Sequence, residues 1–252
     1  MADAKILAVA GKGGVGKTSV SAAMIRLIAR AHPQKRILAI DADPAVGLST
    51  ALGVEPERTL DDIRKEITEE VAGREGGVSD VLEGVKGRLL RSMLHAGGYD
   101  FFAIGRPETA GCYCAVNTYL RQVISLLIHD YDYVVVDSEA GIEQVNRRVL
   151  EKVTHLILVT DASRKGTQVI QTVKRVADEL VMYEKCGAVI NRLSDPSAMD
   201  FVDTGGIPVL SVIGEDADQT EFDILGKSVF DLPDGAAILR GTEEALRKLD
   251  IL

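Results

Sequence analysis

The chain of 252 residues contains no tryptophan, and only 4% of its residues are aromatic. Its core must therefore be mostly aliphatic, which the 46% share of hydrophobic residues allows. No uninterrupted apolar run is long enough to span a bilayer, and the residues before the first predicted strand do not form a signal peptide. We therefore expect a cytoplasmic protein with no membrane partner.

Basic residues are also scarce, since 29 Lys and Arg stand against 38 Asp and Glu, for a net charge of −9. Nucleic acids and anionic lipid surfaces are bound by clusters of Lys and Arg, so we expect neither as a partner. Three cysteines do not make a disulfide framework in a reducing compartment. Cys186 lies in a predicted strand and is expected in the core, whereas Cys112 and Cys114 need another explanation.

The most informative stretch, residues 11–18, has the sequence Gly-Lys-Gly-Gly-Val-Gly-Lys-Thr. It fits the phosphate-binding pattern G-x-x-x-x-G-K-[ST] and lies between a predicted strand at 6–10 and a predicted helix at 19–31. Glycines let backbone N–H groups surround an anion, and a helix N-terminus favours negative charge. We expect Lys17 to contact the β- and γ-phosphates and Thr18 to bind Mg²⁺. The other candidate nucleotide contacts in this loop are Gly11, Lys12, Gly13, Gly14, Val15, Gly16 and Ser19.

Apolar strands alternate with helices along the rest of the chain. Further strands are expected at 36–40, 100–104, 133–137, 155–160, 186–190 and 208–213, and helices within 79–95 and at 115–129, 168–181, 215–226 and 234–249. This pattern predicts an α/β P-loop NTPase fold with a mostly parallel central sheet covered by helices on both faces. We expect one domain over residues 1–252. Its segment 45–98 is a candidate for moving parts and partner contact, or alternatively a disordered surface excursion.

Acidic residues follow two of the predicted strands, where ligands bind in parallel sheets. Asp137 is typical of a carboxylate that holds Mg²⁺ through water, and Asp41 and Asp43 are candidates for the same region, with capping of the loop as the alternative. The Gly141 N–H is a candidate contact to the γ-phosphate.

The base is predicted to be adenine. Asn191 and Arg192 stand where GTP-binding proteins carry Asn-Lys-x-Asp, but Ser194 replaces the aspartate. Guanine would lose a paired acceptor there, whereas Asn191 can still bond the adenine amino group. We therefore expect ATP or ADP together with Mg²⁺.

Cys112 and Cys114 are separated by one residue. Two thiolates at this spacing supply half of a tetrahedral Cys₄ site, and a symmetry-related copy of the chain would supply the other half. The pair therefore indicates Zn²⁺ or Ni²⁺ at the interface of a homodimer. The alternative is two small apolar residues near the start of a helix.

Lys12, second in the loop, makes the stretch similar to the deviant loop of the MinD/ArsA/nitrogenase-iron-protein group of dimeric ATPases. The resemblance implies that Lys12 reaches the nucleotide of the partner subunit, and a solvated lysine or a further contact within one subunit is the alternative. It also implies that Asp43 orients or deprotonates the attacking water, with Asp41 nearer Mg²⁺. Lys12, Lys17 and Asp43 are thus the candidate catalytic residues.

Within that group the chain resembles the CooC-type accessory ATPases that mature the nickel–iron–sulfur centre of carbon monoxide dehydrogenase, and the related acetyl-CoA synthase accessory ATPase. Residues 11–18, 41–43, 111–117 and 137–141 carry this resemblance. It implies ATP hydrolysis coupled to nickel insertion, with carbon monoxide dehydrogenase or acetyl-CoA synthase as the client. A positioning ATPase of the septum or plasmid-partition kind is the main alternative. An iron protein with a shared Fe–S cluster fits the sequence less well, because proteins of that family use two well-separated cysteines per chain, whereas Cys112 and Cys114 are adjacent in the sequence but for one residue.

Overall fold

The computed structural model describes residues 4–72, 85–105, 122–138, 153–180 and 183–252. In these residues eight strands form one sheet in the order β3-β4-β2-β5-β1-β6-β7-β8. All neighbouring strands are parallel except β3 and β4, which are antiparallel. The strands are β1 (Lys5–Gly11), β2 (Ile37–Asp41), β3 (Leu94–Ala96), β4 (Tyr99–Ala103), β5 (Tyr133–Asp137), β6 (His155–Thr160), β7 (Lys185–Leu193) and β8 (Val209–Gly214).

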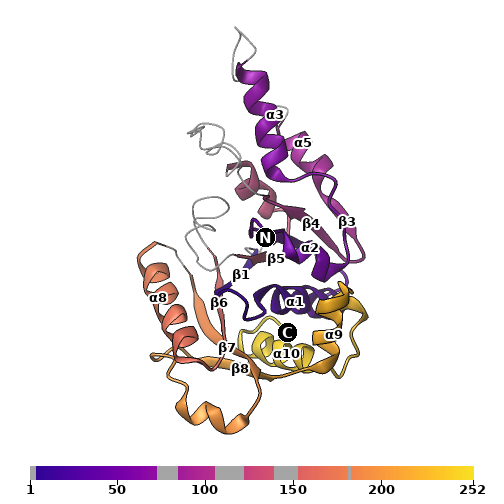
Figure 1. Ribbon diagram of the computed structural model, residues 1–252. Coiled ribbons are helices and arrows are strands. Elements are labelled where there is room, and N and C mark those ends of the chain that lie inside the picture. The colour runs from indigo at the N-terminus through magenta and orange to yellow at the C-terminus, as the bar shows by residue number, and fades with distance from the viewer. Residues whose placement is uncertain (1–3, 73–84, 106–121, 139–152, 181–182) are drawn as a thin grey trace.

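Helices cover both faces of the sheet, as Figure 1 shows. One layer contains α1 (Lys17–Ala31), α2 (Gly47–Leu52), η2 (Val229–Asp231) and α10 (Ala237–Lys248). The other contains α3 (Leu60–Ala72), α5 (Val85–Ser92), the helical residues 122–128 and α8 (Arg164–Leu180). The shorter η1 (Pro196–Phe201) and α9 (Ala217–Leu225) flank β8 along the chain. The predicted fold class, a mostly parallel sheet between two helical layers, is confirmed.

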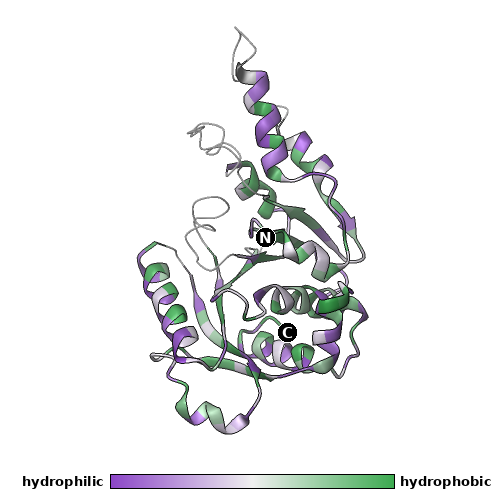
Figure 2. Ribbon diagram, viewed as in Figure 1, coloured by the Kyte–Doolittle hydropathy of each residue, from purple (hydrophilic) through white to green (hydrophobic). Residues whose placement is uncertain are grey.

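The central strands are apolar along their whole length because both of their faces are buried. In β5, Val134 and Val136 pack into one hydrophobic cluster and Val135 packs into the other. Figure 2 shows the same arrangement, with hydrophobic strands between helices that are hydrophobic on one side only. Such strands favour a parallel sheet. Within the described part of the chain, no helix combines the length and hydropathy needed to cross a bilayer.

The segment 45–98 contains α2, α3, α5 and β3 within its described residues. In Figure 1, α3 extends away from the sheet with α5 beside it. Ile63 and Ile67 of α3 are fully buried, so the base of this extension belongs to the core. Its start is a capping box, because Asp62 accepts hydrogen bonds from the Thr59 N–H at 2.9 Å and hydroxyl at 2.7 Å. The alternative of a disordered excursion does not fit these residues.

The topology places the ends of four strands together. Asp41 and Asp137 are register partners at the ends of β2 and β5, and Gly11 pairs with Val159 between β1 and β6. The residues that follow these strands therefore emerge at one edge of the sheet, where ligands bind in this class of fold.

Candidate nucleotide-binding site

The glycine-rich loop joins β1 directly to α1. Gly16 is the residue before the helix and has a left-handed backbone with φ of 88°. Gly11 has φ of 144°, and a Cβ on it would collide with the carbonyl oxygen of Val159 on β6. Both positions require glycine because of their backbone conformation, and Gly11 also requires it because there is no space for a side chain. Val15 and Ser19 are buried, so they support the loop and the first turn of the helix from inside.

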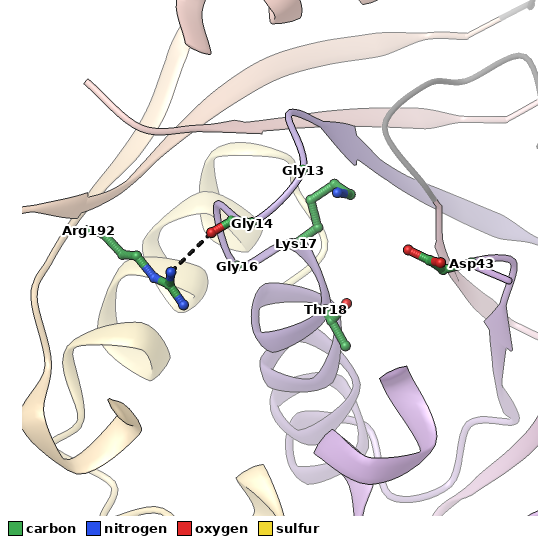
Figure 3. Close-up of a pocket in the computed structure, with 7 residues that line it drawn as sticks. All are labelled: Gly13, Gly14, Gly16, Lys17, Thr18, Asp43 and Arg192. Carbon is green, nitrogen blue, oxygen red and sulfur yellow. Dashed lines mark hydrogen bonds between the residues drawn. The ribbon is translucent and has the colours of Figure 1, made fainter. Parts of the chain in front are cut away.

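A cavity of about 370 Å³ opens on this loop, and it is lined by Gly13, Gly14, Gly16, Lys17, Thr18, Asp43 and Arg192. Figure 3 shows Lys17, Thr18 and Asp43 on one side of the loop and Arg192 on the other. All seven are predicted site residues: six were expected to contact nucleotide, and Asp43 was expected to orient or deprotonate the attacking water. The structure therefore brings together the loop, a carboxylate after β2 and a residue at the end of β7.

The first turn of α1 is tied to the end of β5. The Thr18 hydroxyl donates to Asp137 Oδ2 at 2.7 Å, and the Ser21 hydroxyl donates to Asp137 Oδ1 at 2.9 Å. Thr18 and Asp137 are thus in contact at the place where both were expected to hold Mg²⁺. Ser21 was not predicted as part of the site. Its position one helical turn after Thr18 is the signal that could have found it.

The two Asp residues after β2 organise the following turn. Asp41 accepts backbone N–H bonds from Asp43 at 3.1 Å and from Leu48 at 2.8 Å. Asp43 accepts one from Ala45 at 2.9 Å. Asp41 is fully buried, whereas Asp43 lines the cavity. Both residues cap this turn, and Asp43 in addition faces the space expected to hold phosphate.

Burial raises the pKa of Asp41 from its ordinary value of 3.8 to about 7, and the negative charge of Asp137 adds to the rise. Burial likewise raises the pKa of Asp137 to about 6, although the hydrogen bonds from Thr18 and Ser21 partly oppose it. Two adjacent buried carboxyl groups without a cation oppose each other's ionisation. A divalent cation would favour both charged forms, so this donor set fits Mg²⁺.

The two lysines of the loop are both engaged by protein groups. Lys17 is buried, and its Nζ donates to the Lys12 carbonyl at 3.2 Å. Lys12 Nζ forms an ion pair with Asp161 Oδ2 at 2.7 Å. Asp161 directly follows β6 and was not predicted. In this structure Lys12 therefore has a partner within its own subunit.

Asn191 and Arg192, near the end of β7, donate hydrogen bonds to carbonyl groups of the loop. Asn191 Nδ2 donates to the Val15 carbonyl at 2.8 Å, and the Arg192 guanidinium donates to the Gly14 carbonyl at 3.0 Å. Asn191 Oδ1 is buried and, among the described residues, has no hydrogen-bond partner. A buried amide oxygen without a donor is costly. The expected bond from Asn191 to the adenine amino group stays a prediction.

Three predicted site residues, Cys112, Cys114 and Gly141, lie outside the described residues. The described part of the chain contains no group of three or more His, Cys, Asp or Glu arranged to hold a metal ion through those side chains alone. Cys186 packs against the core as expected, and burial raises its pKa to about 11. A thiol in such surroundings is a poor metal ligand at neutral pH.

A family model described as the CobQ/CobB/MinD/ParA nucleotide binding domain matches residues 6–229. The chain belongs to this family. The match runs from β1 to the first residue of η2 and so includes the loop, the acidic strand ends and Asn191. The chain is thus a P-loop ATPase of the MinD/ParA type, and the resemblance inferred from Lys12 is confirmed at this level.

Individual relatives give finer likenesses. The chain is 34% identical over 251 residues to an uncharacterised ATP-binding protein of Methanocaldococcus jannaschii, covering 97% of this chain and 98% of the relative. It is 30% identical over 249 residues to the carbon monoxide dehydrogenase accessory protein CooC of Rhodospirillum rubrum, covering 89% of this chain and 83% of the relative.

Solved structures match along nearly the whole chain. The septum site-determining protein MinD of Pyrococcus horikoshii, solved with Mg-ADP, has a TM-score of 0.68 at 20% identity, covering 98% of this chain and 96% of that chain. A ParA family ATPase of Chlorobium tepidum has a TM-score of 0.68 at 21% identity, covering 97% and 98%. At these identities the likeness shows the fold.

Proposed function

We propose that this protein binds and hydrolyses ATP with Mg²⁺ and acts as a homodimer. The observation that carries the proposal is the meeting of Lys17, Thr18 and the three carboxylates Asp41, Asp43 and Asp137 at one glycine-rich loop. Phosphoryl transfer requires positioning and charge stabilisation more than covalent chemistry from the protein. The lysines of the loop would stabilise phosphate charge, and the neighbouring carboxylates would position Mg²⁺ and water.

Each residue has a role that its contacts support. Thr18 and Asp137 would hold Mg²⁺, which neutralises phosphate charge when it is bound. Lys17 would exchange the Lys12 carbonyl for phosphate oxygens. Asp43, on the cavity wall, would orient the attacking water, and Gly141 would contact the γ-phosphate. Asn191 Oδ1 would accept from the adenine amino group.

Two substitutions test this assignment. Lys17→Ala should abolish ATP binding measured by calorimetry, because the ammonium is the principal side-chain contact to phosphate. Asp43→Asn should keep ATP binding and lower the hydrolysis rate by about 100-fold or more. Lys35→Ala is the matched control, since Lys35 pairs with Asp132 away from the loop. Normal ATP affinity in Lys17→Ala would remove the proposal.

We further propose that the dimer is a metallochaperone that carries Zn²⁺ or Ni²⁺ and assists nickel insertion into carbon monoxide dehydrogenase or acetyl-CoA synthase. The Cys112 and Cys114 spacing and the 30% identity to the accessory protein CooC support this. Each chain would bring two thiolates, and two chains would complete one tetrahedral site. Residues 45–98, in one domain with the rest, would contribute to contact with the client.

Metal analysis joined to size measurement tests the metallochaperone proposal. Reduced wild-type protein should hold one metal ion per two chains and form dimers with metal. The double variant Cys112→Ser with Cys114→Ser should lose both properties and keep ATP binding. Cys186→Ser, which alters a partly buried cysteine that packs against the core, is the control and should retain the metal. Unchanged stoichiometry in the double variant would argue decisively against a shared thiolate site.

A positioning ATPase of the MinD/ParA kind is the second candidate, because the fold likeness to MinD and ParA proteins supports it equally. Such a protein would need a basic surface for DNA or lipid, and the net charge of −9 speaks against one. Co-sedimentation with anionic vesicles and with DNA, each with and without ATP, distinguishes the two. ATP-dependent pelleting with either would favour the positioning role.

A further inference from the structure

The ion pair between Lys12 and Asp161 joins two neighbouring strands at the edge of the nucleotide site. Lys12 follows β1 and Asp161 follows β6, and the parallel register that pairs Gly11 with Val159 places the two residues side by side. Lys12 Nζ lies 2.7 Å from Asp161 Oδ2 and 3.4 Å from the Ser163 hydroxyl. The contact therefore follows from the sheet itself.

The Asp161 carboxylate is held in place by the start of α8. Its Oδ1 accepts from the Ser163 hydroxyl at 2.5 Å and from the Ser163 N–H at 3.2 Å. The Ser163 hydroxyl in turn accepts from the Gly166 N–H at 3.0 Å. A Cβ on Gly166 would collide with Asp161 Oδ1, so glycine at this position leaves room for the carboxylate. The lysine thus meets a fixed acceptor.

Asp161 also carries the negative charge that an ion pair with Lys12 requires. Partial burial disfavours its ionised form, but hydrogen bonds from Lys12 and Ser163 outweigh this and lower the pKa of the carboxyl. The side chains of Lys12 and Asp161 retain 27% and 31% of their exposure, so a stronger anion can approach and compete. The pair is ordered in one subunit and still accessible from outside.

The second loop lysine links this pair to the nucleotide of the same subunit. Lys17 Nζ donates to the Lys12 carbonyl, and phosphate oxygens would compete for that donor. Nucleotide binding would then remove a bond that fixes the Lys12 backbone, while the Lys12 side chain stays on Asp161 until another anion displaces it.

We propose that Asp161 is a positioning residue that keeps Lys12 within its own subunit until the phosphates of a second copy's nucleotide displace it. The inference rests on the proposed homodimeric function. Opening this ion pair is a cost of dimer formation. Removing the carboxylate therefore makes the ATP-bound dimer form more readily, provided that Lys12 is present.

The first experiment measures the reactivity of the lysine in the nucleotide-free protein. Asp161→Asn should raise the acylation rate of Lys12 by N-hydroxysuccinimide acetate about five-fold, since an ion-paired amine is a poor nucleophile, and this corresponds to about 1 kcal/mol. The matched control is Asp178→Asn, which removes the 2.7 Å partner of Lys174 on α8. It should raise the reactivity of Lys174 and leave Lys12 unchanged. Equal Lys12 reactivity in wild type and Asp161→Asn would overturn the proposal.

The second experiment measures the dimer dissociation constant by sedimentation with Mg²⁺ and a non-hydrolysable ATP analogue. Asp161→Asn should tighten the dimer about five-fold in the wild-type background and have no effect in a Lys12→Ala background. The same change in both backgrounds, or a looser dimer, would show that Asp161 does not act through Lys12. Asp161→Ser is a second, smaller replacement with the same expectation, and thermal melting checks that both variants fold.

Failure of the homodimer proposal can be distinguished from failure of the inference about Asp161. A wild-type protein that stays monomeric with the analogue removes the proposed homodimer and this inference with it. A wild type that dimerises while Lys12 ignores the loss of Asp161 removes this inference alone.

Discussion

Replacing Asp41 by Asn should change how the stability of the metal-free protein depends on pH. Asp41 is fully buried beside Asp137, and its pKa is raised from 3.8 to about 7. A carboxyl whose pKa is higher in the folded state binds more protons there than in the unfolded state between these two values. The stability that Asp41 contributes is therefore fully present below 3.8 and is lost as the pH rises towards 7.

The magnitude follows from the two pKa values. Each pH unit between them lowers the free energy of unfolding by about 1.4 kcal/mol, so raising the pH from about 5 to about 8 costs wild type about 2.5 kcal/mol through Asp41 alone. Asparagine keeps the shape and carries no charge. The difference in unfolding free energy between Asp41→Asn and wild type should therefore shift by about 2.5 kcal/mol in favour of the variant over this range.

Urea denaturation in the presence of a chelator, repeated across this pH range, measures the effect. Asn also changes the bonds to the N–H groups of Asp43 and Leu48, but that effect is independent of pH. Asp132→Asn is the control, because hydrogen bonds from Lys35 and Arg36 lower the pKa of Asp132 and keep it ionised throughout the range. If the gap between Asp41→Asn and wild type stays constant with pH, the assignment of a buried carboxylate cluster is refuted.

Three further predictions concern the loop, the base and the interior. Gly11→Ala should destabilise the fold by more than about 2 kcal/mol because its Cβ meets the Val159 carbonyl, whereas Gly14→Ala, with φ of 78° and open space, should cost only about 1 kcal/mol by thermal melting. Asn191→Ala should weaken ATP binding about ten-fold in calorimetry and change GTP binding much less; equal losses for both nucleotides would contradict the base assignment. Burial lowers the pKa of His155, so the stability that this group contributes should be lost as the pH falls below about 6.5. The difference in unfolding free energy between wild type and His155→Gln should then shift in favour of the variant at low pH; a difference that does not change with pH would contradict this.

Much of the site could be predicted because its residues end apolar strands. Gly11, Asp41 and Asp137 each close a run of hydrophobic residues, and a parallel sheet brings such ends to one edge. The fold class could be predicted for the same reason. The roles given to these residues stay predictions, as do those of Cys112, Cys114 and Gly141.

Other features depend on packing that no motif records. Asp161 and Ser21 are ordinary polar residues in the sequence, and only the register of the sheet and the turn of α1 bring them to the site. Helix α3 was missed because its charged residues dominate the pattern, although Thr59 and Asp62 form a capping box at its start. β3 has only three residues, which is too few for alternation to be visible.

The bonds from Asn191 and Arg192 to the Val15 and Gly14 carbonyls also bear on how tightly an anion is held. A trans peptide directs its C=O and N–H to opposite sides, so fixing these two carbonyls on the β7 side aims the amides of Gly16 and Val15 away from it. The loop is thus preorganised before phosphate binds. Little ordering of the loop therefore remains to oppose the binding of phosphate.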